Sequence, residues 1–211
     1  LDPNDAVAHL RLGQMALVEG KVKEGLALLK RSTECEPGNF DLLLKYLRAC
    51  DEVGDEAEFE TGFQQFLEGK KSDSPFLTAT GCFLDEEIGP TVALRCFDAV
   101  LEHDPDAVYA WFNKGVTLHR IGRETEALFC YECALRLDRT HGFARLNMAL
   151  VLIKQGKRDE AQWHIECFAR DAEPSPVRDL VRMAIQGAAM GLPLESLLLP
   201  LSSPPALRHV M

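Results

Sequence analysis

Residues 108–141 read VYAWFNKGVTLHRIGRETEALFCYECALRLDRTH, and this 34-residue stretch decides the fold. Small residues stand in it where two helices must approach closely, and large apolar residues stand where a core must be filled. Gly122 falls near the middle, where the end of a helix requires a residue that readily adopts a positive φ. The stretch therefore predicts two helices joined by a tight turn.

The same pattern returns at a fixed spacing along the chain. A glycine recurs every 34 residues, with one slot shifted from Ile88 to Gly89; the regular positions are Gly20, Gly54, Gly122 and Gly156. The chain divides without gaps into units 6–39, 40–73, 74–107, 108–141 and 142–175. A period of this length is typical of a stacked repeat array, in which each unit packs on its neighbours.

Equivalent positions of the five units carry similar residues. The twenty-fourth residue of each unit is large and apolar: Leu29, Phe63, Phe97, Tyr131 and Ile165. Unit 40–73 departs most from the pattern, because Leu47 and Phe59 occupy positions that are small in most other units. We expect this bulk to widen the helix packing in that unit.

The pattern resembles the tetratricopeptide repeat, a helix–turn–helix unit of 34 residues. Unit 108–141 is the most similar, with matching residue types at Trp111, Leu118, Gly122, Ala127, Tyr131 and Ala134. The resemblance covers about 170 residues. It implies an all-α, right-handed superhelical solenoid in which the first helix of each unit lines a concave groove.

Both ends of the chain flank these five units. Residues 1–5 are similar to the last residues of a preceding repeat, which predicts that the chain is a piece of a longer array. Residues 176–190 carry one apolar stripe, typical of a helix that caps the last repeat. Residues 191–211 are rich in proline and leucine, so we expect either a mobile tail or leucines docked on this chain or another copy.

Composition excludes several kinds of partner. The formal net charge is −10, which disfavours nucleic acid or an anionic membrane as the main partner. Asp85 belongs to an acidic stretch that we expect to be a solvated face. No apolar run is long enough to cross a membrane. Seven cysteines, an odd number without a disulfide-framework pattern, indicate a reducing compartment, so we expect the cytoplasm.

The groove of units 108–141 and 142–175, called repeats 4 and 5 below, is the predicted partner site. The resemblance places ten candidate residues in it: Tyr109, Phe112, Asn113, Val116, His119, Phe143, Leu146, Asn147, Leu150 and Ile153. The apolar members are expected to form an exposed patch that holds an amphipathic helix or an extended peptide. Asn113 and Asn147 could bracket a peptide backbone, because an amide both donates and accepts. Alternatively, the tail fills the groove, or these residues are ordinary core.

One set of three cysteines and a histidine has the residue types of a metal site. Cys130, Cys133, His164 and Cys167 offer zinc-ligand types at i, i+3 spacing. However, equivalent positions on stacked helices point side by side across about 8–10 Å, which prevents convergence on one ion. We therefore expect no metal and no cofactor.

No catalytic constellation is recognisable in the sequence. The leading hypothesis is a non-catalytic scaffold that binds a protein or peptide in its groove. Two alternatives stay open. The chain could be the regulatory or substrate-selecting array of a larger enzyme, or a homo-oligomer that assembles through its C-terminal tail.

Overall fold

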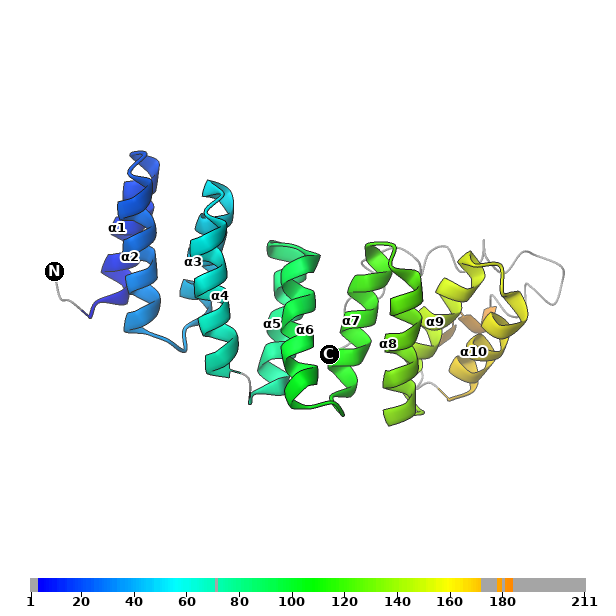
Figure 1. Ribbon diagram of the computed structural model, residues 1–211. Coiled ribbons are helices and arrows are strands. Elements are labelled where there is room, and N and C mark those ends of the chain that lie inside the picture. Colours follow the sequence, from blue (N-terminus) through cyan, green and yellow to red (C-terminus); the bar gives the residue numbers. More distant parts are fainter. Residues whose placement is uncertain (1–3, 71, 172–177, 180, 184–211) are drawn as a thin grey trace. The chain divides into compact units, whose positions relative to one another are not determined.

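The computed structural model describes residues 4–70, 72–171, 178–179 and 181–183, and every regular element in them is an α-helix (Figure 1). The chain divides into two compact units, residues 1–71 and 72–211. In each unit, consecutive helices form antiparallel pairs that stack on one another. The predicted all-α solenoid of helix–turn–helix repeats is confirmed.

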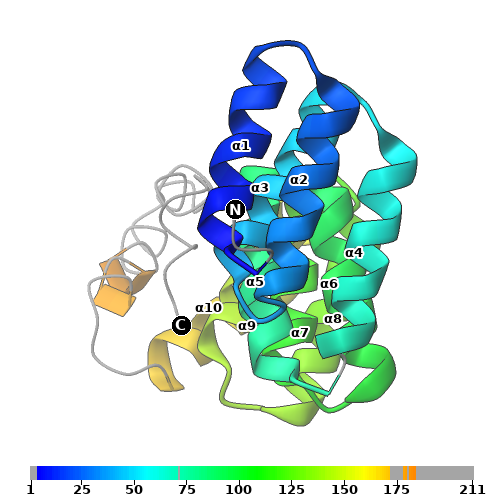
Figure 2. The same cartoon turned by 90° about the vertical axis from the view of Figure 1, so that its left-hand side faces the viewer.

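Two helix pairs make up unit 1, and Figure 2 shows them from the side of α1. The first pair is α1 (Ala6–Val18) and α2 (Val22–Cys35). The second is α3 (Phe40–Val53) and α4 (Glu56–Lys70). Asp5 and Asn39 begin α1 and α3, because each side chain accepts a hydrogen bond from a backbone N–H of the first turn.

Three further pairs make up unit 2. They are α5 (Ser74–Glu87) with α6 (Pro90–His103), α7 (Val108–Arg120) with α8 (Glu124–Leu137), and α9 (Gly142–Lys154) with α10 (Arg158–Asp171). Pro75 and Pro90 stand in the first turns of α5 and α6, where a missing N–H costs nothing. Across both units, the first helices of successive pairs begin 34 residues apart, which is the period of the sequence pattern.

The recurring glycines end the first helix of a pair. Four of them have left-handed backbone conformations: Gly20 (φ 78°), Gly54 (φ 77°), Gly122 (φ 80°) and Gly156 (φ 77°). A side chain would be strained at these angles, which explains glycine at this position. In the pair α5–α6 the shifted Gly89 has φ 143° and directly precedes α6.

The twenty-fourth position of each repeat lies in the core, as predicted. Its five residues are at most 1% exposed: Leu29, Phe63, Phe97, Tyr131 and Ile165. Two of these rings each pack against a glycine on the other helix of the pair. A Cβ added at Gly81 would lie 2.6 Å from Phe97 Cε1, and one at Gly115 would lie 2.6 Å from Tyr131 Cε1.

The helices α3 and α4 pack less closely than the helices of the other pairs, as the bulk of Leu47 and Phe59 predicts. The aromatic residue of this pair, Tyr46, is on the first helix, and its glycine, Gly62, is on the second. A Cβ added at Gly62 would lie 2.6 Å from Tyr46 Cε1. In this pair the aromatic residue and the glycine that meet have thus changed helices, an exchange that the periodic pattern did not indicate.

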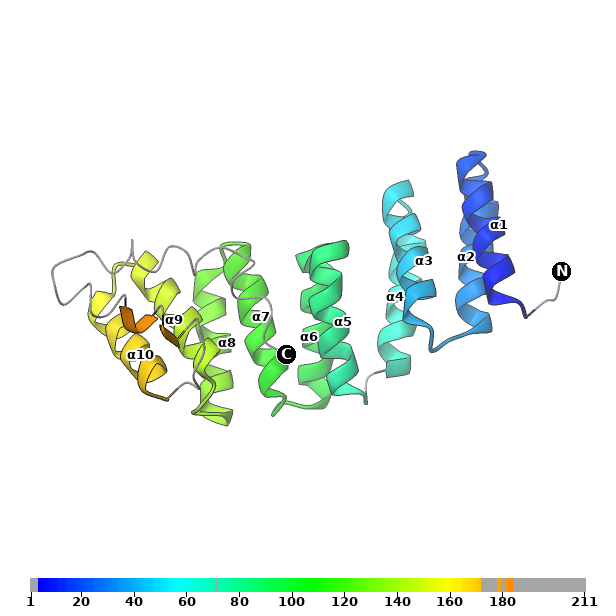
Figure 3. The same cartoon turned by 180° about the vertical axis from the view of Figure 1, so that it is seen from behind.

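The expected capping helix, residues 176–190, lies largely outside the described residues, as does the tail, 191–211. Residues 178–179 and 181–183 are helical and lie beside α10 (Figure 3). Val181 is fully buried in the core cluster of unit 2, and Arg182 Nε donates to the Ala169 carbonyl oxygen at 3.0 Å. This short stretch thus packs on the last repeat.

Candidate functional site

The ten predicted groove residues lie on α7 and α9, the first helices of the last two pairs, but they are not equally accessible. Tyr109 is 62% exposed. Five are half-buried: Asn113, Val116, His119, Phe143 and Ile153. Four are buried: Phe112, Leu146, Asn147 and Leu150. The expectation of one continuous exposed apolar patch is therefore wrong at its three buried members, Phe112, Leu146 and Leu150.

Phe112 is buried because its ring is enclosed by other rings of unit 2. Its centroid lies 6.2 Å from that of Tyr131 on α8 and 4.7 Å from that of His141, which precedes α9. Leu146 and Leu150 belong to the same apolar cluster, which also contains Val181 from the C-terminal stretch. This burial agrees with the alternative that these residues are ordinary core, whereas the alternative that the tail fills the groove concerns residues outside the described ones.

Asn147 does not present its amide to a ligand. It is 2% exposed, and its Nδ2 donates to the Phe143 carbonyl oxygen at 3.0 Å, one turn earlier in α9. Asn113, at the same position of α7, is half-buried. Of the two asparagines that could bracket a peptide backbone, only Asn113 therefore remains a candidate.

Tyr109 and His141 form the accessible edge of the candidate groove. Their ring centroids are 5.8 Å apart with the rings edge to face. His141 Nδ1 accepts a hydrogen bond from the Ala144 backbone N–H at 3.1 Å and so caps α9. Burial lowers the pKa of His141, an effect that Asp138 partly opposes. The neutral ring needed for the cap is favoured by this environment.

Charged residues gather at the other end of α7 and α9. Lys154 Nζ pairs with Glu124 Oε1 at 2.5 Å. The half-buried His119 lies near both, and its pKa is lowered mainly by burial and further by Lys154. A neutral His119 beside this ion pair can donate one hydrogen bond and accept another.

Asp85 is not part of a free acidic face. Arg120 forms an ion pair with its carboxylate, and Thr117 Oγ1 donates to Asp85 Oδ2 at 3.0 Å. Its side chain is only 14% exposed. The expectation of a solvated acidic stretch is wrong at this residue, because α5 and α7 use it to bind each other.

The three cysteines among the candidate zinc ligands lie in other environments. Cys133 Sγ lies 2.9 Å from Arg136 Nη2, and Cys167 Sγ lies 3.7 Å from Arg170 Nη2. Cys130 is buried in the core cluster, which raises the pKa of its thiol to about 12. Within the described residues, no three His, Cys, Asp or Glu side chains gather as metal ligands would.

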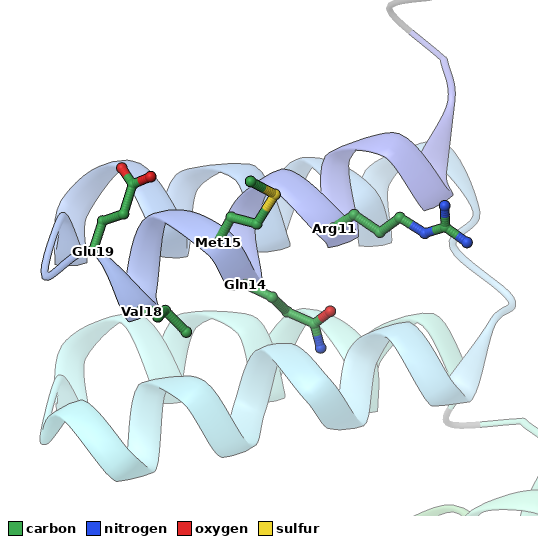
Figure 4. A pocket seen from close by; sticks show the side chains of 5 residues that line it. All are labelled: Arg11, Gln14, Met15, Val18 and Glu19. Atoms are coloured by element: carbon green, nitrogen blue, oxygen red, sulfur yellow. The ribbon is translucent and has the colours of Figure 1, made fainter.

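A second accessible surface lies on α1, which belongs to unit 1, whereas the predicted groove residues belong to unit 2. Three large apolar side chains are exposed there: Val7 by 50%, Met15 by 58% and Val18 by 90%. An open hollow on this helix is lined by Arg11, Gln14, Met15, Val18 and Glu19 (Figure 4). In Figure 4, Arg11, Met15 and Glu19 follow one another along the helix.

The sequence contained a signal for this surface. Helices α1 and α9 each have nine apolar residues among thirteen, yet α9 buries eight of its residues and α1 only three. Helix α1 therefore has the composition of a buried helix but the exposure of a surface helix. Part of its apolar face is not buried by the rest of unit 1.

Within the described part of the chain, no helix combines the length and the apolar character that crossing a membrane requires.

Comparison with known proteins identifies the repeat. The sequence pattern of the tetratricopeptide repeat matches residues 108–141. No curated relative matches the chain. Several solved structures share its fold, among them YrrB, a tetratricopeptide-repeat protein with an unusual peptide-binding site. The TM-score with YrrB is 0.52 at 16% identity, over 88% of this chain and 94% of that one.

Two further solved structures are similar. Pseudomonas aeruginosa PilF has a TM-score of 0.52 at 19% identity, over 99% of this chain and 97% of that one. Yeast Tom70 has a TM-score of 0.54 at 18% identity, over 90% of this chain and 41% of that one. At these identities the likeness concerns the fold.

Proposed function

From the premise that residues 108–141 are a tetratricopeptide repeat in a chain with the fold of such repeat proteins, we propose that the protein is a non-catalytic scaffold for protein–protein interaction. The observation that carries the proposal is a large aromatic side chain, Tyr109, held 62% exposed on a helix whose other face is packed in the core. A rigid frame that presents such a residue lowers the ordering cost of capture.

The finer proposal assigns the ligand to the edge of repeats 4 and 5. Tyr109, Asn113 and Phe143 would contact an apolar helix or an extended peptide, above a floor of Phe112, Leu146 and Leu150. The buried floor residues support this role by fixing the geometry of the edge. Val116, His119 and Ile153 would extend the contact toward the Lys154–Glu124 pair, which offers both charges to a polar end of the ligand.

We place this activity in a reducing compartment, the cytoplasm. The support is that all seven cysteines are free thiols: Cys35, Cys50, Cys82, Cys96, Cys130, Cys133 and Cys167. Burial raises the pKa of Cys82 to about 11 and that of Cys96 to about 12, so these thiols stay protonated and inert near neutral pH.

The test is a selection of displayed random peptides against the full 211-residue chain, followed by affinity measurement with variants. We expect selected peptides to lose at least about tenfold in affinity on Tyr109→Ala, because truncating an aromatic hot-spot residue costs about 2 kcal/mol or more and about 1.4 kcal/mol is tenfold. The matched control is Phe129→Ala, since Phe129 is 53% exposed on α8, outside the proposed edge.

Two outcomes would count against the proposal. If no peptide is enriched, the edge is not a peptide site. If Phe129→Ala weakens binding as much as Tyr109→Ala, the selected peptides recognise general apolar exposure and not the edge of repeats 4 and 5.

A further inference from the structure

Two exposed aromatic side chains recur at the same place on the second helices of the last two pairs, outside the proposed peptide edge. Phe129 on α8 is 53% exposed, and Trp163 on α10 is 56% exposed. They stand 34 residues apart, at the twenty-second position of units 108–141 and 142–175. We propose that each of them is the centre of a docking site for a basic segment of a partner protein, in which lysines or arginines flank an apolar side chain.

The two aromatic residues share their charged neighbours. A glutamate stands one helical turn before each ring and another stands one turn after it, since residues three apart on a helix are neighbours. We name these sets the α8 row and the α10 row: Glu126, Phe129 and Glu132 in the first, and Glu160, Trp163 and Glu166 in the second. All four glutamates are exposed. Each ring thus lies between two carboxylates, which favours a cationic partner over a phosphate-bearing one.

Core packing does not explain why these residues recur. A buried position repeats because it must fill the core, but an exposed position has no such requirement. In the first three units the twenty-second residue is not aromatic: Ala27, Thr61 and Arg95. The exposed aromatic residue with its two glutamates is therefore a feature of the last two units, and it indicates a contact that these two units make outside the chain.

The ring of Phe129 is held in place by its neighbours. Trp111 on α7 packs edge to face on it, with the ring centroids 5.8 Å apart. The indole is itself fixed, because its Nε1 donates to the Pro105 carbonyl oxygen at 2.8 Å. A ring that is positioned before binding loses less side-chain freedom on capture of a ligand.

The ring of Trp163 has an equivalent support. Arg145, at the same position of its unit as Trp111, lies over this ring with its Cζ 5.6 Å from the centroid. Its Nη2 donates to the Arg139 carbonyl oxygen at 2.6 Å, again six residues earlier in the chain. The contact also shows the attraction of this indole for a guanidinium group, the kind of group that a basic partner would bring to the ring.

The carboxylates of the two rows can exchange their present contacts for those of a partner. Glu126 forms an ion pair with Arg123, and both side chains are about half exposed. Glu166 accepts a hydrogen bond from Gln162 at 2.9 Å, also at the surface. Exposed polar contacts of this kind contribute little, so replacing them costs little.

The exposure of this position does not depend on where the chain begins or ends. Phe129 belongs to the fourth of the five described helix pairs, so described pairs precede and follow it, and its ring is still 53% exposed. Trp163 occupies the same position of the next pair. Its exposure agrees with that of Phe129 and follows from its place in the repeat.

The experiment begins with a selection of displayed random peptides against the full chain carrying Tyr109→Ala, which removes the anchor of the proposed edge. We expect enriched peptides to be basic, with lysine or arginine three or four positions from an apolar residue. The most enriched peptide is then synthesised and titrated into the wild-type chain by isothermal titration calorimetry. Wild type and Tyr109→Ala should bind it equally, and added salt should weaken it.

The number of peptides bound per chain tests whether both rows are sites. We expect two peptides per chain in the wild type and one in either Phe129→Ala or Trp163→Ala. The double variant should bind at least about tenfold more weakly, because an aromatic hot-spot residue is lost from both sites. Circular dichroism verifies that the variants keep their helix content.

A charge reversal tests the carboxylates in a chain that keeps only the α10 row. On the Phe129→Ala background, Glu160→Lys should weaken the peptide at least about threefold. The matched control is Glu24→Lys on the same background. Glu24 is the third residue of α2, as Glu160 is of α10, but the residue three positions after it is Ala27 and not an aromatic. The control should leave the affinity unchanged.

Four results would overturn the proposal. They are the absence of any enriched peptide, enriched peptides without net positive charge, a peptide count that neither aromatic variant lowers, and equal weakening by Glu24→Lys and Glu160→Lys. None of them concerns peptides selected on the wild-type chain that require Tyr109. Failure of this inference is therefore distinguishable from failure of the proposed function.

Discussion

Gly115 shows what one residue contributes to the repeat. It is buried in α7, and its missing side chain leaves room for the ring of Tyr131 on α8. A Cβ at this position would lie 2.6 Å from Cε1 and 2.8 Å from Cδ1 of that ring. Tyr131 is itself fully buried, so the ring has little freedom to move away.

We predict that Gly115→Ala destabilises the protein by about 1–3 kcal/mol, because an inserted methyl group overpacks a filled core. Urea denaturation followed by circular dichroism, which reports the helices of both units, measures the change. The control is Gly69→Ala: Gly69 lies in α4, and a Cβ there would meet nothing within 4 Å. Alanine should be neutral there or stabilise by up to about 1 kcal/mol, because it favours helix. Equal stability of both variants would refute the close-packing argument.

His141 connects the residue to the element, because it caps α9 through Nδ1 and packs on Phe112. Two other half-buried histidines, His119 and His164, also have pKa values lowered chiefly by burial. A folded-state pKa below the unfolded value of about 6.5 means that the unfolded chain binds the proton more readily. The stability that these neutral rings contribute is fully present above about pH 6.5. It is lost as the pH falls from there through their lower folded-state pKa values.

The corresponding prediction is a melting temperature that decreases between pH 7.5 and pH 5.5. His141→Asn should make the decrease smaller, because asparagine caps a helix without titrating. The matched control is His103→Asn, since His103 is exposed near the end of α6 and is not the capping residue of that helix. Differential scanning calorimetry checks the effect. A His141→Asn profile as steep as that of the wild type would contradict the role of this cap.

At the scale of the whole molecule, stability is local, because a repeat array sums the terms of each repeat and its neighbours. Unit 2 contains a large buried cluster. In unit 1, α3 buries seven residues, but α1 buries only Ala6, Gly13 and Ala16, and α3 and α4 pack less closely than the helices of the other pairs. Both tryptophans of the chain, Trp111 and Trp163, lie in unit 2. Fluorescence therefore reports unit 2, while circular dichroism reports all helices.

We predict that the two signals do not coincide in urea. The circular-dichroism midpoint should lie below the fluorescence midpoint by at least about 0.5 M, the shift expected for a stability difference of about 1 kcal/mol. Coincident curves from the same samples would show that both units unfold together, contrary to this expectation.

The sequence by itself determined the helix pairs. Glycine spacing indicated where the first helix of a pair ends, since a positive φ is a local backbone requirement that glycine meets most easily. The large twenty-fourth residue and its small partners indicated how a pair packs, because those contacts repeat with the chain. The family resemblance rested on the same local features, above all in residues 108–141.

Only the tertiary structure decided which side chains remain accessible. Phe112, Leu146 and Leu150 have the residue types of an open apolar groove, but rings and leucines from other helices enclose them. Tyr46 and Gly62 exchange roles across α3 and α4, and Arg120 neutralises Asp85 across α5 and α7. Burial of a side chain depends on neighbours that are distant in sequence. A periodic pattern gives the residue type at each position, but it does not show which distant side chains pack against that position.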